Sequence, residues 1–398
     1  MAIGVVGLGY VGLPLVVAFA QAGESVIAVD VDQRKVDALA IGESYVEDIS
    51  SDLLRSVLGS VHAGTDYAPL ADVEAILICV PTPLTANREP DLRPLQDSAQ
   101  ALAGVVREGQ LVVLESTSYP GTTRELLIPV LEQGSSLTAG TEFNVAFSPE
   151  RVDPGRTDFT LKNTPKVVGG ITERCADRAA ELYGRVCDEV IRVSTPEAAE
   201  LTKLLENIFR SVNIALVNEL SIVAERMGID IWEVVDAAAT KPYGFMRFEP
   251  GPGMGGHCLP VDPFYLTWRA REFHMSTEFI ELALNDAAKP VRGSKIVLLG
   301  VAYKGGIGDI RESPALRIIE ELTRRGAQLV YHDDFVPDLP QLGLANTPLE
   351  EALDGADAVV LVTAHPGVPH LEIARESALF VDLRGVTRGI HSNGLVRL

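Results

Sequence analysis

The chain has 398 residues, 46% hydrophobic and 22% charged, a composition typical of a globular protein too long for one ordinary core. Its 34 Lys and Arg against 55 Asp and Glu give a formal net charge of −21, which argues against nucleic acid or an anionic membrane as a partner. The first residues carry no basic leader, and the longest apolar run, near Leu13 to Ala20, is too short to cross a bilayer. We therefore expect a cytoplasmic protein.

Residues 1–195 alternate short β-branched runs with helical stretches. The runs AIGVVGL, SVIAVDVD, EAILICVP, QLVVLEST and FNVAFSPE predict strands, with helices over Val11 to Gln21 and through Ala40. Strand and helix alternating at this spacing predict a parallel sheet with helices on both faces.

The glycines of GVVGLGYVGLP follow the first predicted strand and open a helix. Gly7, Gly9 and Gly12 have the G-x-G-x-x-G spacing that allows a tight turn, a close approach of the backbone to a pyrophosphate, and helix packing on the strand. The alternative is a tight turn without a ligand. Asp30 closes the second strand, where a carboxylate bonds a ribose 2′-hydroxyl and repels a 2′-phosphate, so we predict NAD rather than NADP. Lys35 either supports the adenosine end or is a solvated lysine.

From Pro196 the pattern becomes helical over many turns. Residues 196–288 are predicted to form a central helical domain, which serves as a dimer interface or bridges two domains. The apolar positions with helical spacing are Leu201, Leu204, Leu205, Ile208, Val212, Ala215, Leu216 and Leu220.

Residues 289–398 return to alternation, with strands in SKIVLLGVAYK, QLVYHDD, AVVLVTAH and ALFVDLRG and a helix from Pro314 to Arg325. The segment GVAYKGG again follows a strand but lacks the full dinucleotide pattern. The fold class expected is α/β, with two Rossmann-like doubly wound domains joined by a central helical segment.

The four cysteines form no C-x-x-C pair, so neither a disulfide framework nor a metal site is predicted. Cys79, Cys175 and Cys187 are expected to pack in or near the core. Cys258 lies in GPGMGGHCLPVDP, too rich in glycine and proline for helix or strand interior. It is interpreted as a packed thiol, a metal ligand or a nucleophile that forms a thioester from an aldehyde. The nucleophilic chemistry also needs a group that donates to an oxyanion and a group that activates water.

Seven segments occur in an order that resembles the UDP-glucose/GDP-mannose dehydrogenase family over nearly the whole chain. They are GLGYVGLP, CVPTP, ESTSYPGTT, FSPERVDPG, AAELTKLLENIFRSVNIALVNEL, GPGMGGHCLPVDPFYL and GVAYKGGIGDIRESPAL. The resemblance implies NAD-dependent four-electron oxidation of the C6 hydroxyl of a nucleotide sugar. FEPGPGMGGHCLPVDPFYLTWRA looks most like UDP-N-acetylglucosamine 6-dehydrogenases, with UDP-N-acetylmannosamine enzymes close behind, so UDP-N-acetylglucosamine is the substrate expected. A UDP-glucose enzyme, a two-electron β-hydroxyacid dehydrogenase and a binding protein without activity are the alternatives.

The resemblance also implies roles for single residues. Cys258 is the nucleophile, Lys203 and Asn207 stabilise the oxyanion, Asp262 helps to activate water, Glu150 takes part in acid–base steps, and Thr117 touches water and cofactor. Thr82 lines the nicotinamide side and Arg311 reaches NAD, while Lys304 binds substrate. The remaining predicted contacts are Tyr10 and Val11 for the cofactor, and Arg151, Arg247, Phe248 and Gly255 for the substrate. Caps, turns, packing and surface ion pairs are the alternative roles of these residues.

One departure concerns length. Near Ala283 and Leu284 the family usually continues through further helical turns, whereas EFIELALNDAAKPVRGSK passes almost directly into the last domain. A helical segment is expected to be absent there. The chain is also expected to form a homodimer or a larger homo-oligomer.

Overall fold

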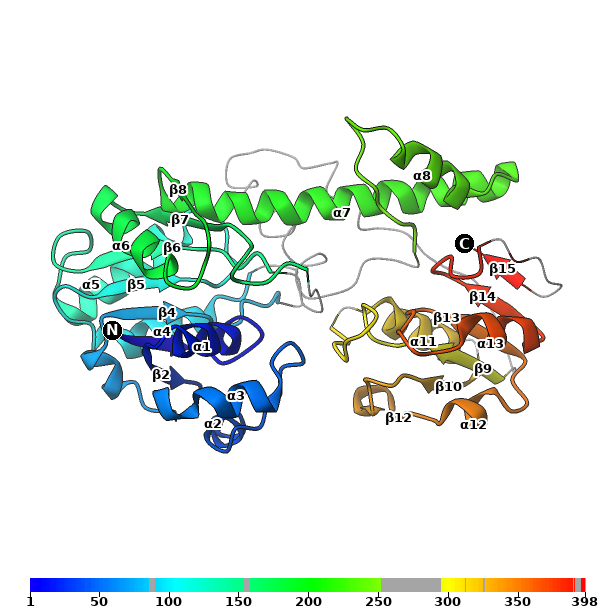
Figure 1. Cartoon of the computed structure of the whole chain (residues 1–398), viewed down its shortest axis with the longest axis horizontal. Coiled ribbons are helices and arrows are strands. Elements are labelled where there is room, and N and C mark those ends of the chain that lie inside the picture. Colours follow the sequence, from blue (N-terminus) through cyan, green and yellow to red (C-terminus); the bar gives the residue numbers. More distant parts are fainter. Residues whose placement is uncertain are drawn as a thin grey trace. The chain divides into compact units, whose positions relative to one another are not determined.

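The computed structural model describes residues 1–85, 90–152, 158–251, 295–311, 313–324, 326–388, 390 and 395–397. The described residues fall in two compact units, one running from Met1 to Glu206 and the other beginning at Asn207 (Figure 1). No helix within these ranges is long and apolar enough to span a membrane.

An eight-stranded sheet forms the centre of the first unit, in the order β3-β2-β1-β4-β5-β6-β7-β8. Neighbouring strands are parallel except β6 and β7, which pair antiparallel through Ala146–Gly170 and Phe147–Gly169. The strands are β1 (Ala2–Val6), β2 (Ser25–Val29), β3 (Val61–Gly64), β4 (Ala75–Ile78), β5 (Leu111–Leu114), β6 (Asn144–Phe147), β7 (Lys166–Gly170) and β8 (Val190–Val193).

Helices cover both faces of this sheet because successive residues of a strand point to opposite sides. Val5 joins a core with α1, α2, α3 and α6, whereas Val6 joins a core with α4, α5 and the start of α7. The helices are α1 (Gly12–Gln21), α2 (Gln33–Ala40), α3 (Ser51–Val57), α4 (Arg93–Ala103), α5 (Ile128–Ser135) and α6 (Glu173–Tyr183), with short turns η1 (Leu58–Ser60), η2 (Ala68–Asp72) and η3 (Thr123–Leu127).

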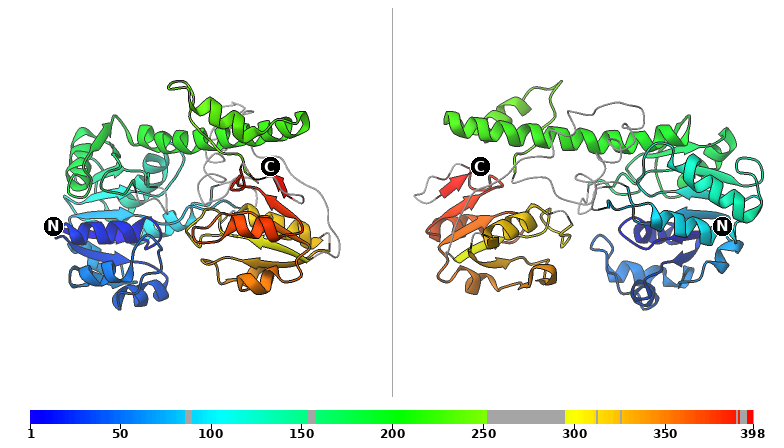
Figure 2. Two further views of the ribbon diagram at one scale, coloured as in Figure 1. Left: turned by 45° about the vertical axis from the view of Figure 1, so that its right-hand side comes forward. Right: turned by 180° about the vertical axis from the view of Figure 1, so that it is seen from behind.

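A single long helix, α7 (Pro196–Met227), follows, and α8 (Ile231–Ala239) comes after it. Figure 2 shows α7 unbroken in two further views. Asp230 caps α8 by accepting the Trp232 amide, and Ile231, Trp232 and Val235 bury its apolar face with Ala224 of α7.

The second unit contains a parallel five-stranded sheet in the order β10-β9-β13-β14-β15. One face packs on α11, and the other packs on α12 and α13. The elements are β9 (Lys295–Leu299), α11 (Pro314–Arg324), β10 (Gln328–His332), a β11 (Asp338–Leu339) and β12 (Leu344–Ala345) ladder joined by η4 (Pro340–Leu342), α12 (Leu349–Leu353), β13 (Ala358–Leu361), α13 (His370–Glu376), β14 (Phe380–Asp382) and β15 (Leu395–Arg397).

The predicted fold class is confirmed, with two doubly wound α/β sheets and the long helix between them in sequence. The sequence does not predict the strands β3, β7, β8, β11, β12 and β15, and β7 runs antiparallel to β6 in a sheet expected to be parallel. The division at 1–195, 196–288 and 289–398 stays a prediction, since α7 contributes residues to both compact units.

Glu200 anchors the start of α7 on the first unit. Its carboxyl group is almost fully buried and accepts the Gly121 amide at 2.6 Å, the Thr123 amide at 2.9 Å and the Thr123 hydroxyl at 2.7 Å. These amides lie where η3 begins, and helix starts leave amides without backbone partners. Glu197, one turn earlier, makes a more exposed ion pair with Arg124.

Replacing Glu200 by Ala is expected to lower the free energy of unfolding by about 2–3 kcal/mol, because buried amide donors lose their acceptor. Glu197→Ala is the matched control and should cost less than about 1 kcal/mol, as exposed ion pairs do. Urea unfolding followed by circular dichroism measures both. Equal effects of the two changes would contradict the anchoring role.

Candidate active site

The glycine turn after β1 has the geometry that its sequence predicts. Gly7 has φ +92°, and a Cβ there would lie 2.6 Å from the Cys79 carbonyl oxygen. A Cβ on Gly12 would lie 1.8 Å from the Gly7 carbonyl oxygen, whereas no atom lies within 4 Å of a Cβ built on Gly9. Gly7 and Gly12 are therefore required by packing, and Gly9 leaves open space at the turn. The partly buried Tyr10 and Val11 pack against the core beside it.

The start of α1 and the end of β2 complete this region. Val11 gives α1 no side-chain cap, and its first turn holds no acidic residue. Asp30 accepts the Leu8 amide at 2.7 Å, the Asp32 amide at 2.8 Å and Lys35 Nζ at 2.8 Å. A carboxylate accepts about four hydrogen bonds, so capacity for a ribose hydroxyl remains.

These residues fit NAD. The uncapped helix start suits a pyrophosphate, Gly9 allows its close approach, and Asp30 suits the adenosine ribose. The bound cofactor would accept hydride from the substrate. Lys35, which is predicted either to support the adenosine end of the cofactor or to be solvated, forms an ion pair with Asp30.

Thr82 and Thr117 lie together beyond the carboxyl ends of β4 and β5. Thr82 Oγ1 donates to the Thr117 carbonyl oxygen at 2.7 Å, and Ser116 Oγ donates to the Val80 carbonyl oxygen at 2.6 Å. The hydroxyl of the adjacent, buried Ser118 has no hydrogen-bond partner within the described chain. A buried hydroxyl without a partner is uncommon, which makes this edge suited to a polar ligand.

Glu150 belongs to a buried cluster of charges at the same edge. Lys166 Nζ lies 2.8 Å from Glu115 Oε2 and 3.3 Å from Glu150 Oε2, and the Tyr183 hydroxyl donates to Glu115. Glu115 follows β5 and Glu150 follows β6, whereas Lys166 opens β7. Because β7 runs antiparallel to β6, its first residue reaches the edge where β5 and β6 end.

The cluster determines which form Glu150 takes. Burial alone would raise the pKa of Glu150, but Lys166, the Val152 amide and Lys203 outweigh burial and hold the pKa below its ordinary value. Burial raises the pKa of Glu115, and Lys166 offsets only part of the effect. Burial would lower the pKa of Lys166, but the two glutamates raise it. Glu150 is therefore a carboxylate at neutral pH, the form that accepts a proton.

The first turns of α7 bring further predicted residues to this region. Lys203 is buried and its Nζ donates to the Glu150 carbonyl oxygen, while Glu206 pairs with Arg151 at 2.6 Å. Asn207 is fully buried, one helical turn after Lys203, and accepts a hydrogen bond from Arg210. Lys203, Glu150 and Arg151 thus lie together, and the catalytic and substrate-binding roles predicted for them stay predictions.

Three cysteines behave as the sequence suggests. Cys79, Cys175 and Cys187 are buried and free. Burial raises the pKa of Cys79 well above its ordinary value and that of Cys187 to about 11, so both are neutral thiols and poor nucleophiles. Among the residues that the structure describes, no cluster of His, Cys, Asp and Glu is suited to hold a metal ion.

Other predicted residues belong to the second unit. Lys304 and Arg311 lie in the segment after β9, where Arg311 forks onto Asp309 with contacts of 2.6–3.1 Å. Arg247 pairs with Asp236 and Glu249, and the Phe248 ring meets Phe209 edge-on with centroids 5.8 Å apart. These contacts agree with the structural alternatives for Arg247 and Phe248; the ligand contacts predicted for all four residues stay predictions. Cys258, Asp262 and Gly255 lie outside the described residues.

Comparison with known proteins decides the family. Residues 1–187 match the NAD binding domain of the UDP-glucose/GDP-mannose dehydrogenase family, residues 197–287 its central domain, and residues 297–389 its UDP binding domain. The chain belongs to this family. It is an NAD-dependent nucleotide-sugar dehydrogenase, as the ordered segments of its sequence predict.

The chain is 37% identical to the UDP-N-acetyl-D-mannosamine dehydrogenase of Escherichia coli K12 over 395 residues, covering 91% of this chain and 93% of the relative. It is 35% identical to the NDP-N-acetyl-D-galactosaminuronic acid dehydrogenase of Ralstonia nicotianae over 412 residues, covering 96% of each. The solved structure of UDP-D-ManNAc dehydrogenase from Pyrococcus horikoshii is similar with a TM-score of 0.90 and 32% identity, covering 100% of this chain and 99% of that one.

The alignment with the Escherichia coli relative also bears on chain length. It spans 395 positions but only 91% of this 398-residue chain, so at some positions the relative alone has a residue. This agrees with the expectation that a segment is absent. The predicted place of the shortening, near Ala283 and Leu284, lies outside the described residues.

Sequence reasoning missed the charged partners around Glu150. Glu115 begins the quoted segment ESTSYPGTT, and Lys166 opens the apolar run KVVGG. The available signal was a charged residue at the end of an apolar run.

In the second unit, sequence reasoning missed Arg384, which follows β14. Its Nε donates to the Val362 carbonyl oxygen at 2.6 Å. Burial lowers the pKa of Arg384, and Glu249 and Asp382 offset part of that effect.

Lys166→Met tests the charge cluster. At pH 7.5 we expect a loss of about 3 kcal/mol in the free energy of unfolding, because two glutamates remain buried without their cation. In the native chain Glu150 has a lowered pKa, so its contribution is present above the ordinary pKa and disappears as the pH falls. Without Lys166 burial would raise the pKa of both glutamates, so the loss should shrink at pH 5.

The exposed Lys162 provides a matched control, and Lys162→Met should change the free energy of unfolding by less than about 0.5 kcal/mol at either pH. Urea unfolding at the two pH values measures these differences. A Lys166→Met effect that is the same at both pH values would refute the charge account.

Proposed function

We propose that this chain oxidises the C6 hydroxyl of a UDP-N-acetylhexosamine to a carboxylate, with NAD⁺ as hydride acceptor. The observation that carries the proposal is the buried Lys203, whose Nζ donates to the Glu150 carbonyl oxygen and whose charge helps to keep the Glu150 carboxyl ionised, at the carboxyl edge of the sheet where Thr82 and Thr117 also lie. A cation for an oxyanion and a carboxylate for a proton are the groups that such an oxidation needs.

The proposed oxidation has two stages, from alcohol to aldehyde and from aldehyde to carboxylate. The alcohol first loses a hydride to NAD⁺ and a proton, which gives an aldehyde. The Cys258 thiolate and a proton add across the aldehyde carbonyl to form a thiohemiacetal. The thiohemiacetal loses a hydride to a second NAD⁺ and a proton to become a thioester, and water then releases the carboxylate and the thiol. Lys203 and Asn207 stabilise the oxyanion, while Glu150 and Asp262 assist the attacking water. The roles of Cys258 and Asp262 rest on the family resemblance.

Among the UDP-N-acetylhexosamines we place UDP-N-acetylmannosamine first. The Escherichia coli and Pyrococcus horikoshii relatives carry the name of that substrate, and the Ralstonia relative is named for another N-acetylated sugar acid. UDP-N-acetylglucosamine, the substrate expected from the sequence, is the second candidate. UDP-glucose, which has no N-acetyl group, ranks after both.

The second α/β half is proposed to take the uridine diphosphate. Its glycine turn after β9 does not offer amides to a pyrophosphate, because the Val301 and Ala302 amides both donate to Asp333 Oδ2, at 2.7 and 3.2 Å. Side chains such as Lys304 must therefore recognise the nucleotide. Since only the first half presents the dinucleotide pattern, both hydrides pass through one NAD site in succession.

NADH stoichiometry tests the function. With UDP-N-acetylmannosamine, UDP-N-acetylglucosamine and UDP-glucose as the panel, we expect the first to be oxidised with the highest kcat/KM and with two NADH formed per sugar acid. Cys258→Ser should lose turnover to the acid by about a thousandfold or more, because the thioester cannot form. One NADH per sugar, or full activity of the serine variant, would exclude the thioester route.

A homodimer is proposed through an apolar stripe on α7. The stripe consists of seven side chains, each at least 44% exposed: Leu201, Leu205, Phe209, Leu216, Leu220, Val223 and Met227. Their spacings of three, four and seven residues place them on one side of the helix, opposite the side that buries Glu200, Lys203 and Asn207. An apolar row of this length, continuous along one helix, suits the same row of a second copy.

Leu216→Glu together with Leu220→Glu is expected to shift the chain from dimer to monomer at micromolar concentration, because the charges would be buried at the interface. Glu225→Lys, on the opposite side of α7, is the control and should leave the dimer intact. Sedimentation velocity distinguishes the states. A native chain that sediments as a monomer would contradict the proposed dimer.

A further inference from the structure

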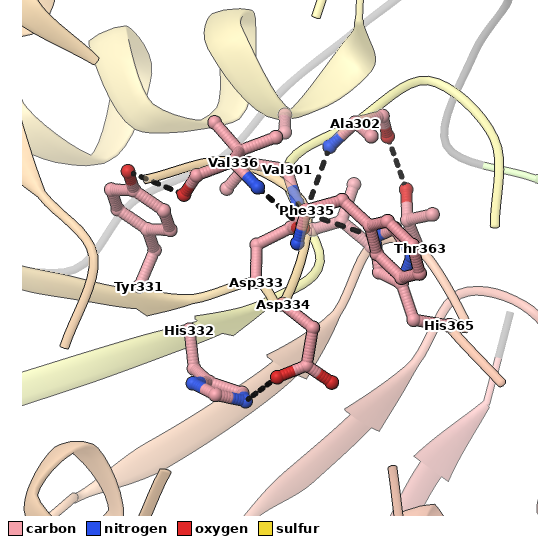
Figure 3. Close-up of polar contacts among 12 residues, drawn as sticks. Val301, Ala302, Tyr331, His332, Asp333, Asp334, Phe335, Val336, Thr363 and His365 are labelled. Carbon is pink, nitrogen blue, oxygen red and sulfur yellow. Dashed lines mark hydrogen bonds and ion pairs between the residues drawn. The ribbon is translucent and has the colours of Figure 1, made fainter. Parts of the chain in front are cut away.

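Two loops meet at the carboxyl edge of the five-stranded sheet, one after β9 and one after β13. His365, from the second loop, is buried, and Figure 3 shows its ring joined to Asp333. Its Nε2 lies 2.9 Å from Asp333 Oδ2, and its Nδ1 lies 3.0 Å from the Gly306 amide nitrogen. The Phe335 ring stacks on it with centroids 4.8 Å apart. The imidazole therefore connects the end of β10 to the loop that carries Lys304.

The two partners of the His365 ring fix the direction of both hydrogen bonds. Burial would raise the pKa of Asp333, but His365 and the backbone amides that donate to it hold the pKa below its ordinary value. An ionised carboxylate only accepts hydrogen bonds, so His365 Nε2 carries the proton. The Gly306 amide can only donate, so the other nitrogen, Nδ1, accepts this bond through its lone pair.

The loop is held on both sides of Lys304. Two residues before it, the Ala302 carbonyl oxygen accepts the Thr363 hydroxyl at 2.5 Å; two residues after it, Gly306 donates to His365. Gly306 has φ +83°, and a Cβ on Gly305 would lie 2.3 Å from the Ala364 carbonyl oxygen. The glycines that follow Lys304 thus allow a close fit on the β13 loop, and the His365 bond holds one of the conformations open to them.

We propose that His365 is a positioning residue of the nucleotide-sugar site, which fixes the loop of Lys304 before the substrate arrives. The inference rests on the proposed function, in which Lys304 binds the nucleotide sugar. A loop containing adjacent glycines loses much conformational entropy when it closes on a ligand, and a loop already held by two hydrogen bonds loses less. His365 therefore acts on affinity for the nucleotide and not on hydride transfer.

The test compares three variants of the full chain. His365→Leu removes both hydrogen bonds, whereas His365→Asn keeps an acceptor near the position of Nδ1 and retains the bond to Gly306. His332→Leu is the matched control, because this histidine is similarly buried on β10 but its ring contacts the Thr347 carbonyl oxygen and Asp334. It reports the effect of losing a buried histidine in the same domain.

For His365→Leu we expect the KM for the nucleotide sugar and the Kd for UDP alone to rise about tenfold, with kcat within about twofold and the KM for NAD⁺ unchanged. His365→Asn should recover most of the affinity, and His332→Leu should leave it unchanged. Hydrogen exchange at the Gly306 amide should accelerate in His365→Leu, stay slow in His365→Asn, and stay slow in His332→Leu.

The two readouts separate the possible failures. Faster exchange at Gly306 with unchanged affinity for UDP would overturn the positioning role and leave the proposed function standing. Equal loss of affinity in His332→Leu, or no rescue by His365→Asn, would reduce His365 to a structural residue. A native chain that neither binds UDP nor oxidises a UDP-sugar would refute the proposed function, while Gly306 exchange would still report the hydrogen bond.

Discussion

Both α/β halves depend on one constraint: some backbone amides in the turn after the first strand have no backbone acceptor and need another one. In each half a carboxylate at the end of the second strand accepts the first of them: Asp30 takes the Leu8 amide and Asp333 takes the Val301 amide. The two carboxylates differ in the hydrogen-bonding capacity that they have left for a ligand. Asp333 also takes the amides of Ala302, Phe335 and Val336 and the His365 ring, whereas Asp30 has spare capacity beside an uncapped helix. The same type of fold therefore leaves room for a dinucleotide at the turn of the first half, whereas the turn of the second half already has its amides paired.

A second constraint is electrical neutrality below the surface of the first unit. Glu115 and Glu150 would bury two negative charges, Lys166 balances one of them, and Lys203 of α7 contributes to the low pKa of Glu150. The antiparallel β7 is what delivers Lys166 to the edge where β5 and β6 end. A parallel β7 would place its first residue at the opposite edge, and the two glutamates would lack their cation.

The sequence was sufficient for the features that repeat locally. The glycine spacing, the helical period of α7 and the alternation of long strands all predict the elements observed, and seven ordered segments identify the family. It was insufficient for β3, β7, β8 and β15, because VHAG, KVVGG, VIRV and LVR contain glycine or polar residues among few apolar ones and their pairing depends on distant strands. For the same reason it located Glu150 and Lys203 but not Lys166, Glu115 or His365, whose roles arise from contacts between residues far apart in the chain. The nucleophile expected at Cys258 lies outside the described residues.

The sides of α7 explain why one helix holds several of the predicted site residues. Its buried side carries Glu200, which fixes the helix on η3, and then Lys203 and Asn207 within two further turns. An α-helix transmits the position of one residue to the next turn with little freedom, so the hydrogen bonds of Glu200 also fix the position of the Lys203 ammonium beside Glu150. The opposite side is apolar and exposed. In the proposed dimer a second copy covers this side and stiffens the helix that presents Lys203, so the proposed assembly and the proposed oxyanion stabilisation depend on the same element.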